Sequence, residues 1–152
     1  MDLLALDAQL CFSLYAASRA VTAAYGPLLA PLGLTYPQYL VMLVLWEADR
    51  VPVSTIGERL HLDSGTLTPL LTKLEQRGLV VRHRDEADAR VVRIALTPTG
   101  RSLKRRAQKI PEALACTFEL SHPAIARLRS ELVALTQTVR AANAAATPGA
   151  KS

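Results

Sequence analysis

Apolar side chains recur every three or four residues along most of this chain, which predicts a mainly helical protein. Residues 3–30 carry one continuous apolar seam and predict a long first helix, which Pro31 and Gly33 should end. The next helix should run from a Thr35 cap to about residue 48. Because this segment is apolar nearly all round, we expect it to be central and buried.

Residues 53–99 follow a different pattern, and the rest of the chain is organised around them. Ser54 is expected to cap a short helix that ends near Leu60. After a tight turn, Asp63 or Ser64 should cap a second helix. The apolar stripe of this second helix is formed by Leu67, Leu70, Leu71 and Leu74.

Two β-rich runs follow the second helix, at residues 79–84 and 91–96. The six residues between them, 85–90, are polar except for two alanines. Such a pattern predicts a β-hairpin with an exposed tip.

The exposed side of the second helix is rich in hydrogen-bond donors and uncharged at its start. Short hydroxyls with one cation and one amide suit a helix that lies against phosphates and base edges. A helix that needed only solubility would more often carry Glu and Lys at these positions. The candidate DNA-contacting residues of this helix are Ser64, Thr66, Thr68, Thr72, Lys73 and Gln76.

Two helices joined by a short turn and followed by a hairpin predict a winged helix-turn-helix, in which the second helix enters the major groove and the hairpin reaches the minor groove. Arg82 and Arg84 lie on the first strand of this hairpin, and Arg90 lies at its tip. We expect Arg90 to enter the minor groove and Asp88 to orient its guanidinium through a charge-assisted bond. The alternative is that Asp88 and Arg90 only rigidify the loop, and both roles can coexist.

The remaining helices predict a dimer. A basic fifth helix, capped by Thr97, should run through Lys109 and bend at Pro111. Paired terminal helices from two chains would place two recognition helices one DNA turn apart, matching a palindromic operator. The expected fold is mainly α with a small β-hairpin wing, divided into N-terminal dimerisation helices (1–48), the winged helix-turn-helix (49–100), C-terminal dimerisation helices (101–146) and a disordered tail (147–152).

Charge is concentrated in the centre of the 152-residue chain, whose formal net charge is +5. Residues 73–109 contain eleven Lys and Arg against four acids, a local charge of +7, so the remainder sums to −2. This distribution favours a nucleic-acid partner over an evenly solvated charged face. No apolar run reaches the ~18 residues of a membrane span. The N-terminus lacks the basic region of a signal peptide, so we expect a cytoplasmic protein.

The two cysteines, Cys11 and Cys116, do not form a CxxC pair. With His61, His83 and His122 also lacking ligand spacing, the sequence predicts no metal site and no cofactor. We expect no structural disulfide in a cytosolic protein, which leaves inert buried thiols or redox chemistry. A reactive thiol must be partly ionised, whereas an ordinary one has a pKa near ~8.5.

The order of these elements and several motifs resemble the MarR family of bacterial repressors over about residues 5–142. The family signature corresponds here to residues 63–80, 85–90 and 96–100. More narrowly, the chain is similar to the organic hydroperoxide resistance regulators through Leu10-Cys11-Phe12-Ser13-Leu14-Tyr15, residues 34–42 and residues 62–71.

This resemblance implies a dimeric repressor that leaves its operator when an organic hydroperoxide oxidises Cys11. It also implies that Cys116 of the other subunit captures the oxidised sulfur as a disulfide, and that Tyr25 and Tyr36 bond the reactive cysteine across the dimer interface. From the residues alone, Tyr15 is a further candidate to support the thiol, because it lies four positions after Cys11. An apolar neighbour such as Phe12 suits a fatty or aryl hydroperoxide.

Two other functions remain open from the sequence. One is a repressor of the same family that a small phenolic or hydrophobic ligand releases, with incidental cysteines; blocking Cys11 would leave its response intact. The other is a cysteine peroxidase, which would turn over hydroperoxide with a reductant. The winged-helix pattern argues against this enzyme.

Overall fold

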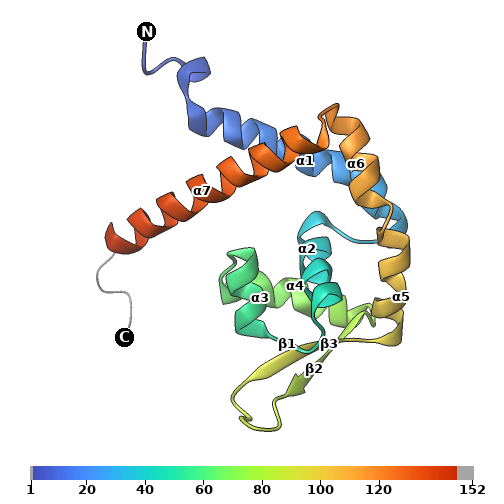
Figure 1. The fold of residues 1–152 in the computed structure, drawn as a ribbon. Coiled ribbons are helices and arrows are strands. Elements are labelled where there is room, and N and C mark those ends of the chain that lie inside the picture. The colour runs from blue at the N-terminus through green and yellow to red at the C-terminus, as the bar shows by residue number, and fades with distance from the viewer. Residues whose placement is uncertain (1, 147–152) are drawn as a thin grey trace. The chain divides into compact units, whose positions relative to one another are not determined.

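The computed structural model of the chain describes residues 2–146 (Figure 1). The chain divides into two compact units, one ending at Ile110 and the other beginning at Pro111, and each is described by itself. The tail expected at residues 147–152 lies outside the described residues. The mainly helical fold with a small β wing is confirmed.

The first helix, α1, spans Leu10–Leu29, so the prediction that it begins near residue 3 is wrong. A short 3-10 turn, η1 (Leu6–Ala8), precedes it. Local bonds compete with the helix here: the Asp2 carboxylate accepts from the Leu4 amide at 2.9 Å, and the Gln9 side chain donates to the Leu3 carbonyl.

After α1, the chain turns through a second 3-10 segment, η2 (Ala30–Leu32), and Gly33 ends it in the left-handed conformation with φ +64°. Helix α2 then spans Tyr36–Glu47. Its expected cap at Thr35 is confirmed. The backbone amide of Gln38 donates to the Thr35 hydroxyl, and the backbone amide of Thr35 donates to the side-chain oxygen of Gln38. The predicted burial of α2 is also confirmed, with Val41 and Met42 fully buried.

The two helices of the helix-turn-helix are α3 (Val53–Leu60) and α4 (Ser64–Gln76). Asp63 caps α4 as expected, because its carboxylate accepts from the Thr66 amide at 2.8 Å. The expected Ser54 cap of α3 is wrong. The helix begins two residues earlier than this cap would give, at Val53 behind Pro52, whose fixed φ already favours a helix entry.

A three-stranded antiparallel sheet projects beyond these helices (Figure 1). Its strands, in the order β1-β3-β2, are β1 (Val51–Pro52), β2 (Val80–Arg84) and β3 (Val92–Leu96). The β2–β3 hairpin agrees with the prediction, and its register pairs Val80 with Leu96 and Arg84 with Val92. Strand β1 was not predicted, because two residues including a proline carry no alternating pattern.

Helix α5 spans Pro98–Ala107, and the Thr97 hydroxyl caps it by accepting from the Gly100 amide at 3.0 Å. The expected continuation to a bend at Pro111 is wrong, because a new helix, α6, begins at Ile110 and runs to Phe118. The break places Pro111 in the first turn of α6, where a missing amide hydrogen breaks no helical bond.

In the second unit, the last helix α7 spans His122–Ala146. The residues before it form a loop in which Glu119 adopts φ +52°. Within residues 2–146, no single helix is long and apolar enough to cross a membrane, and one bent pair, Leu10–Leu32 with Tyr36–Glu47, passes by length and composition alone.

Candidate DNA-binding surface and cysteine sites

The predicted reading face of α4 is exposed. Leu67, Leu71 and Leu74 are buried beneath it. The hydroxyl, cationic and amide positions on the opposite side are exposed, and they are Ser64, Thr66, Thr68, Lys73 and Gln76. The helix therefore presents short hydrogen-bond donors to solvent while its leucines fix it to the protein.

Thr72 and Arg82 differ from the other candidates, because they take part in bonds within the chain. The Arg82 guanidinium donates to the Glu75 carboxylate at 2.6 Å and to the Thr72 hydroxyl at 3.0 Å. The Thr72 hydroxyl in turn donates to the Thr68 carbonyl at 3.0 Å. These bonds join α4 to the first strand of the wing. Direct contacts of Thr72 and Arg82 with DNA stay a prediction.

The wing tip is built on Asp85, which the sequence reasoning missed. Its carboxylate accepts from the amides of Ala87 (2.9 Å) and Asp88 (3.1 Å) and pairs with the Arg93 guanidinium. The bond with Arg93 and the two amide bonds lower the pKa of Asp85 below its ordinary value. An aspartate followed by a tight polar turn is the signal that identifies such a residue.

At the end of the wing, Asp88 orients Arg90, as predicted. The Asp88 carboxylate accepts from Nε and Nη2 of Arg90, both at 3.0 Å, and from the Arg90 amide at 3.0 Å. These bonds lower the pKa of Asp88 and raise that of Arg90. The Arg90 side chain remains 92% exposed, so its outer edge is free to meet an anion. Entry into the minor groove stays a prediction.

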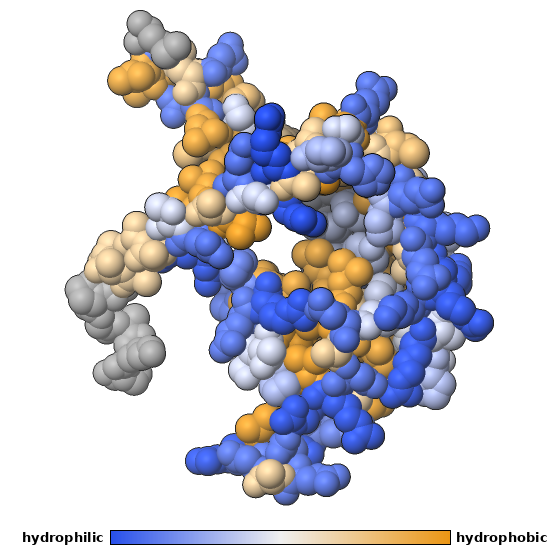
Figure 2. All heavy atoms as spheres, in the orientation of Figure 1, coloured by the Kyte–Doolittle hydropathy of each residue, from blue (hydrophilic) through white to orange (hydrophobic). Residues whose placement is uncertain are grey.

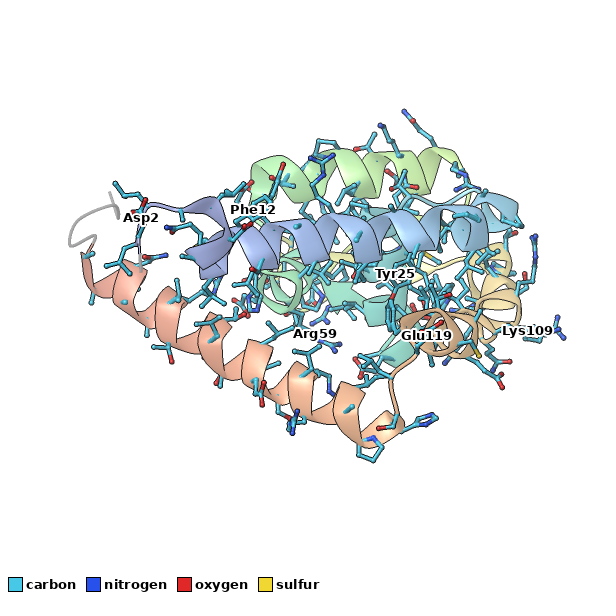
Figure 3. The ribbon with its side chains drawn as sticks, turned by 90° about the horizontal axis from the view of Figure 1, so that it is seen from above. Asp2, Phe12, Tyr25, Arg59, Lys109 and Glu119 are labelled. Atoms are coloured by element: carbon cyan, nitrogen blue, oxygen red, sulfur yellow. The ribbon has the colours of Figure 1, made fainter. Side chains whose placement is uncertain are left out.

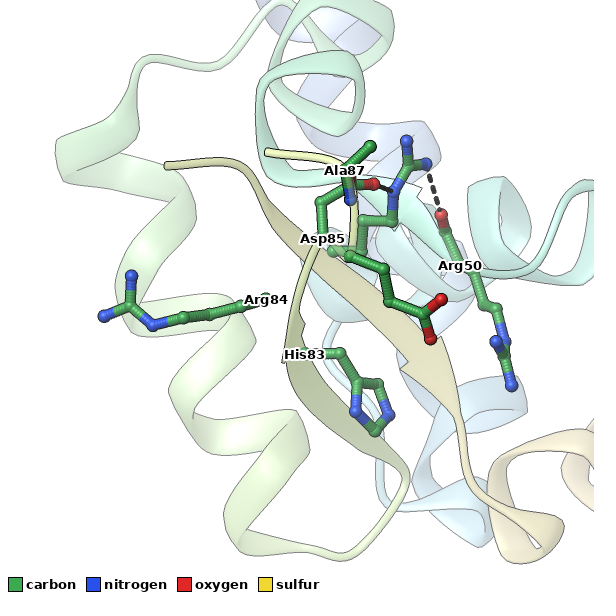
Figure 4. A pocket seen from close by; sticks show the side chains of 7 residues that line it. Arg50, His83, Arg84, Asp85 and Ala87 are labelled. Carbon is green, nitrogen blue, oxygen red and sulfur yellow. Dashed lines mark hydrogen bonds and ion pairs between the residues drawn. The ribbon is translucent and has the colours of Figure 1, made fainter. Parts of the chain in front are cut away.

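Arg84, a further candidate on the wing, donates to the Ala89 carbonyl at 2.9 Å and so supports the loop. Figure 4 shows its side chain pointing away from that of His83, as neighbours on a strand do. A cleft of about 610 Å³ lies alongside the wing. It is lined by Arg50, His83, Arg84, Asp85, Glu86, Ala87 and Arg93.

Several of the basic side chains of α5 bond the protein itself. Arg101 pairs with Asp49 at 2.6 Å, Lys104 donates to the Trp46 carbonyl at 2.7 Å, and Arg106 donates to the Pro31 carbonyl at 2.6 Å. Part of the charge that the sequence reasoning assigned to DNA therefore anchors α5 to the rest of its unit. Sequence alone carries no signal for these acceptors, because most are backbone carbonyls.

Cys11 lies on α1 and Cys116 on α6, and both thiols are free and exposed. Tyr15 follows Cys11 by one helical turn and is itself exposed. Arg19, a turn further, donates to the Tyr15 hydroxyl at 3.3 Å, with its guanidinium carbon 5.6 Å from the ring centroid. The two cysteines belong to different units of the chain.

Tyr25 and Tyr36 lie together, with ring centroids 4.5 Å apart. Their bonds to the reactive cysteine stay a prediction. Burial raises the pKa of Tyr25 to about 12, and the pKa of Tyr36 is raised in the same way. Both phenols therefore keep their protons at neutral pH and remain hydrogen-bond donors. Figure 3 shows Tyr25 along α1, toward the end of the helix opposite to Phe12.

The aromatic cluster extends to Tyr39, which the sequence reasoning did not select. Its ring lies 5.7 Å from that of Tyr25 and 6.2 Å from that of Trp46, between centroids. The indole of Trp46 donates to the Gly100 carbonyl at 2.9 Å, which connects the cluster to α5.

Hydrophobic side chains are exposed along the N-terminal segment and α1 (Figure 2). They include Leu3, Leu4, Leu6, Leu10, Phe12 and Val21. In the second unit, α7 likewise exposes Leu128, Leu132, Val133 and Val139. No cluster of three or more His, Cys, Asp or Glu that could hold a metal ion occurs in the part of the chain that the structure describes.

Comparison with known proteins agrees with this geometry. The family model of the transcriptional regulators SarA and Rot matches residues 23–107. The chain is 46% identical over 142 residues to the organic hydroperoxide resistance transcriptional regulator of Bacillus subtilis (strain 168), covering 93% of this chain and 97% of that one. It belongs to the MarR family of transcriptional regulators.

Solved structures of this MarR family include two states of AbfR of Staphylococcus epidermidis. Reduced AbfR bound to DNA is 36% identical, with a TM-score of 0.75 over 92% of this chain and 96% of that one. AbfR in its disulfide form is 38% identical, with a TM-score of 0.59 over 89% of this chain and 90% of that one.

Proposed function

We propose that this MarR-family protein is a homodimeric repressor that leaves its DNA operator when an organic hydroperoxide oxidises Cys11. The observation that carries the proposal is the location of the two free, exposed cysteines on helices outside the winged helix-turn-helix. It is supported by the relationship to an organic hydroperoxide resistance regulator and to AbfR, which is known bound to DNA and in a disulfide form.

In the reduced state, α4 enters the major groove and the wing follows the minor groove. The hydroxyl-rich face of α4 supplies base and phosphate contacts, and Arg90 supplies the minor-groove contact. Asp88 holds the Arg90 guanidinium before DNA arrives, which reduces the side-chain entropy lost on binding. A dimer presents two such readers and therefore recognises a palindrome.

Oxidation proceeds in two balanced steps. The Cys11 thiolate attacks the outer peroxide oxygen, the O–O bond breaks, and the alkoxide takes up a proton and leaves as an alcohol. The Cys116 thiolate of the other subunit then attacks the sulfur of the Cys11 sulfenic acid, which releases water once the departing hydroxide is protonated. Tyr15 of the same chain, with Tyr25 and Tyr36 across the dimer interface, supplies phenol donors that stabilise the Cys11 thiolate.

Dimerisation accounts for the apolar side chains that the single chain leaves exposed on α1 and α7. The disulfide requires the α-carbons of Cys11 and Cys116 to come within ~7 Å. Where the two start further apart, its formation draws the terminal helices to new positions and moves the readers.

The protein acts in the cytoplasm, where its DNA partner and a reducing thiol pool are both present. It reacts once per reduction cycle and is therefore a sensor, with no turnover of hydroperoxide.

The proposal is tested with a duplex selected by the reduced protein from a random-sequence pool. In a gel shift, cumene hydroperoxide should abolish binding by the wild type, and dithiothreitol should restore it. Cys11→Ser should bind DNA and ignore the oxidant. Retention of the duplex by oxidised wild type would refute the redox mechanism.

The connection between subunits has its own test. In a heterodimer of a Cys11→Ser chain with a Cys116→Ser chain, one subunit keeps only Cys116 and the other keeps only Cys11. A bond between these two cysteines can therefore form only across the interface. Such a heterodimer should form a covalent dimer on a non-reducing gel, whereas a Cys11→Ser homodimer should not.

A further inference from the structure

The turn η2, which directly follows the helix of Cys11, is fastened to the recognition helix by an arginine. Nη2 of Arg77 donates to the Leu32 carbonyl at 3.1 Å, and Nη1 donates to the Gly33 carbonyl. Arg77 directly follows α4 as its C-cap residue. The C-terminal end of the DNA reader is thus bonded to the segment that begins where α1 ends.

A second arginine bonds the same segment, because Arg106 of α5 donates to the Pro31 carbonyl at 2.6 Å. Buried leucines hold the same segment, because Leu29, Leu32 and Leu34 are all less than one-tenth exposed. In the part of the chain that the structure describes, Leu29 is the one buried residue of α1. Helix α1 is therefore packed into its own unit mainly through its C-terminal end.

Gly33 shows how closely the guanidinium fits. A Cβ atom at this position would lie 2.5 Å from Nη2 of Arg77, so the guanidinium occupies the space of a side chain. The planar fork of arginine spans two successive carbonyls, which the single ammonium of lysine cannot reproduce.

We propose that Arg77 is a positioning residue for the redox response, and that it transmits movement of α1 to the recognition helix. The inference rests on the proposed function. When the disulfide draws α1, the turn η2 moves with it, and the two bonds of Arg77 carry the end of α4 along. Without these bonds, η2 and α4 move independently, so the oxidised protein keeps more of its DNA affinity.

The measured quantity is the release ratio, the operator Kd after oxidation with cumene hydroperoxide divided by the reduced Kd. Arg77→Met should lower this ratio by about fivefold or more, the size expected when a coupling interaction is removed. Gly33→Asn should do the same without changing the arginine, because its Cβ displaces the guanidinium.

Gly78→Asn is the matched control. Gly78 also has a positive φ, +66°, so Asn at this position has the same unfavourable backbone conformation as Asn at Gly33. Its added Cβ would meet no heavy atom within 4 Å, so this variant lacks the clash with the Arg77 guanidinium. Its release ratio should equal that of the wild type. Thermal unfolding verifies that each variant is folded. If Arg77→Met does not fold, the release ratio of Gly33→Asn alone tests the role of the Arg77 bonds.

The competing role for Arg77 is binding to a DNA phosphate, whose removal would reduce the slope of log Kd against log salt by about one. An unchanged release ratio in both variants, or a lowered slope in reduced Arg77→Met, would overturn the proposal. If wild type itself is not released, the proposed function fails, whereas normal release of both wild type and variants refutes only the role of Arg77.

Discussion

The winged helix and the first helix use their apolar side chains in opposite ways. In α3 and α4, Ile56 and Leu74 are fully buried, and in α1 the side chains of Leu10 and Tyr15 are about 60% exposed (62% and 59%). The winged helix therefore completes its core within one chain. Helix α1 leaves apolar surface that only another surface can cover.

Polar side chains repeat the contrast. Asp49 accepts from the Leu96 amide at 2.8 Å and pairs with Arg101, so one carboxylate joins the end of α2 to β3 and α5. In α1, the sequence carries a single charged residue, Arg19, which donates to a tyrosine of the same helix. The proposed reading of DNA thus depends on a structure fixed within one chain. The proposed switch, in contrast, lies on a helix whose apolar side chains the single chain leaves exposed.

The largest expected effect comes from Leu74→Ala. Removing a fully buried leucine from under the reading face should lower the free energy of unfolding by about 2–5 kcal/mol. Urea unfolding measures the decrease. Leu10→Ala, at an exposed position of α1, should instead raise the dimer dissociation constant measured by sedimentation. An equal decrease of unfolding free energy in both variants at a concentration that keeps the dimer intact would break the comparison.

The same contrast explains how much of the structure could be predicted from the sequence. Caps at Thr35, Asp63 and Thr97 and the exposed face of α4 follow from local spacing, and the structure confirms them. Contacts between distant residues carry no such signal. The bonds of Arg77 to Leu32 and Gly33 span more than forty positions and end on backbone carbonyls that any residue provides.

Local spacing also could not predict the arrangement of the tyrosines that are proposed to support the Cys11 thiol. The position of Cys11 one turn before Tyr15 could be predicted, because both lie on one helix. The clustering of Tyr25 with Tyr36 crosses the turn between α1 and α2, and the addition of Tyr39 depends on packing that periodicity does not encode. The role of these phenols at the thiol stays a prediction.

A smaller effect is expected at the wing, which belongs to the fixed region but directs Arg90 into solvent. Arg90→Ala should weaken operator binding by about several-fold, since the substitution removes one cation from the minor groove. Fluorescence anisotropy on the selected duplex measures this. Arg127→Ala is the control, because it removes an exposed cation from α7, where Arg127 pairs with Glu131. Equal affinities for Arg90→Ala and wild type would remove the role of Arg90.

The smallest effect is confined to alkaline pH and tests the aromatic contact between α1 and α2. The pKa of Tyr25 is raised to about 12, above the value near 10 in an unfolded chain. Its contribution to stability is therefore complete below pH ~10 and disappears as the pH rises toward 12, because the unfolded chain ionises first. In Tyr25→Phe, the decrease of unfolding free energy between pH 8 and pH 11 should be smaller than in wild type. An equal decrease in Tyr25→Phe and wild type would mean that the Tyr25 phenol is not held in the buried contact, and that the C-terminal half of α1 is as open as its beginning.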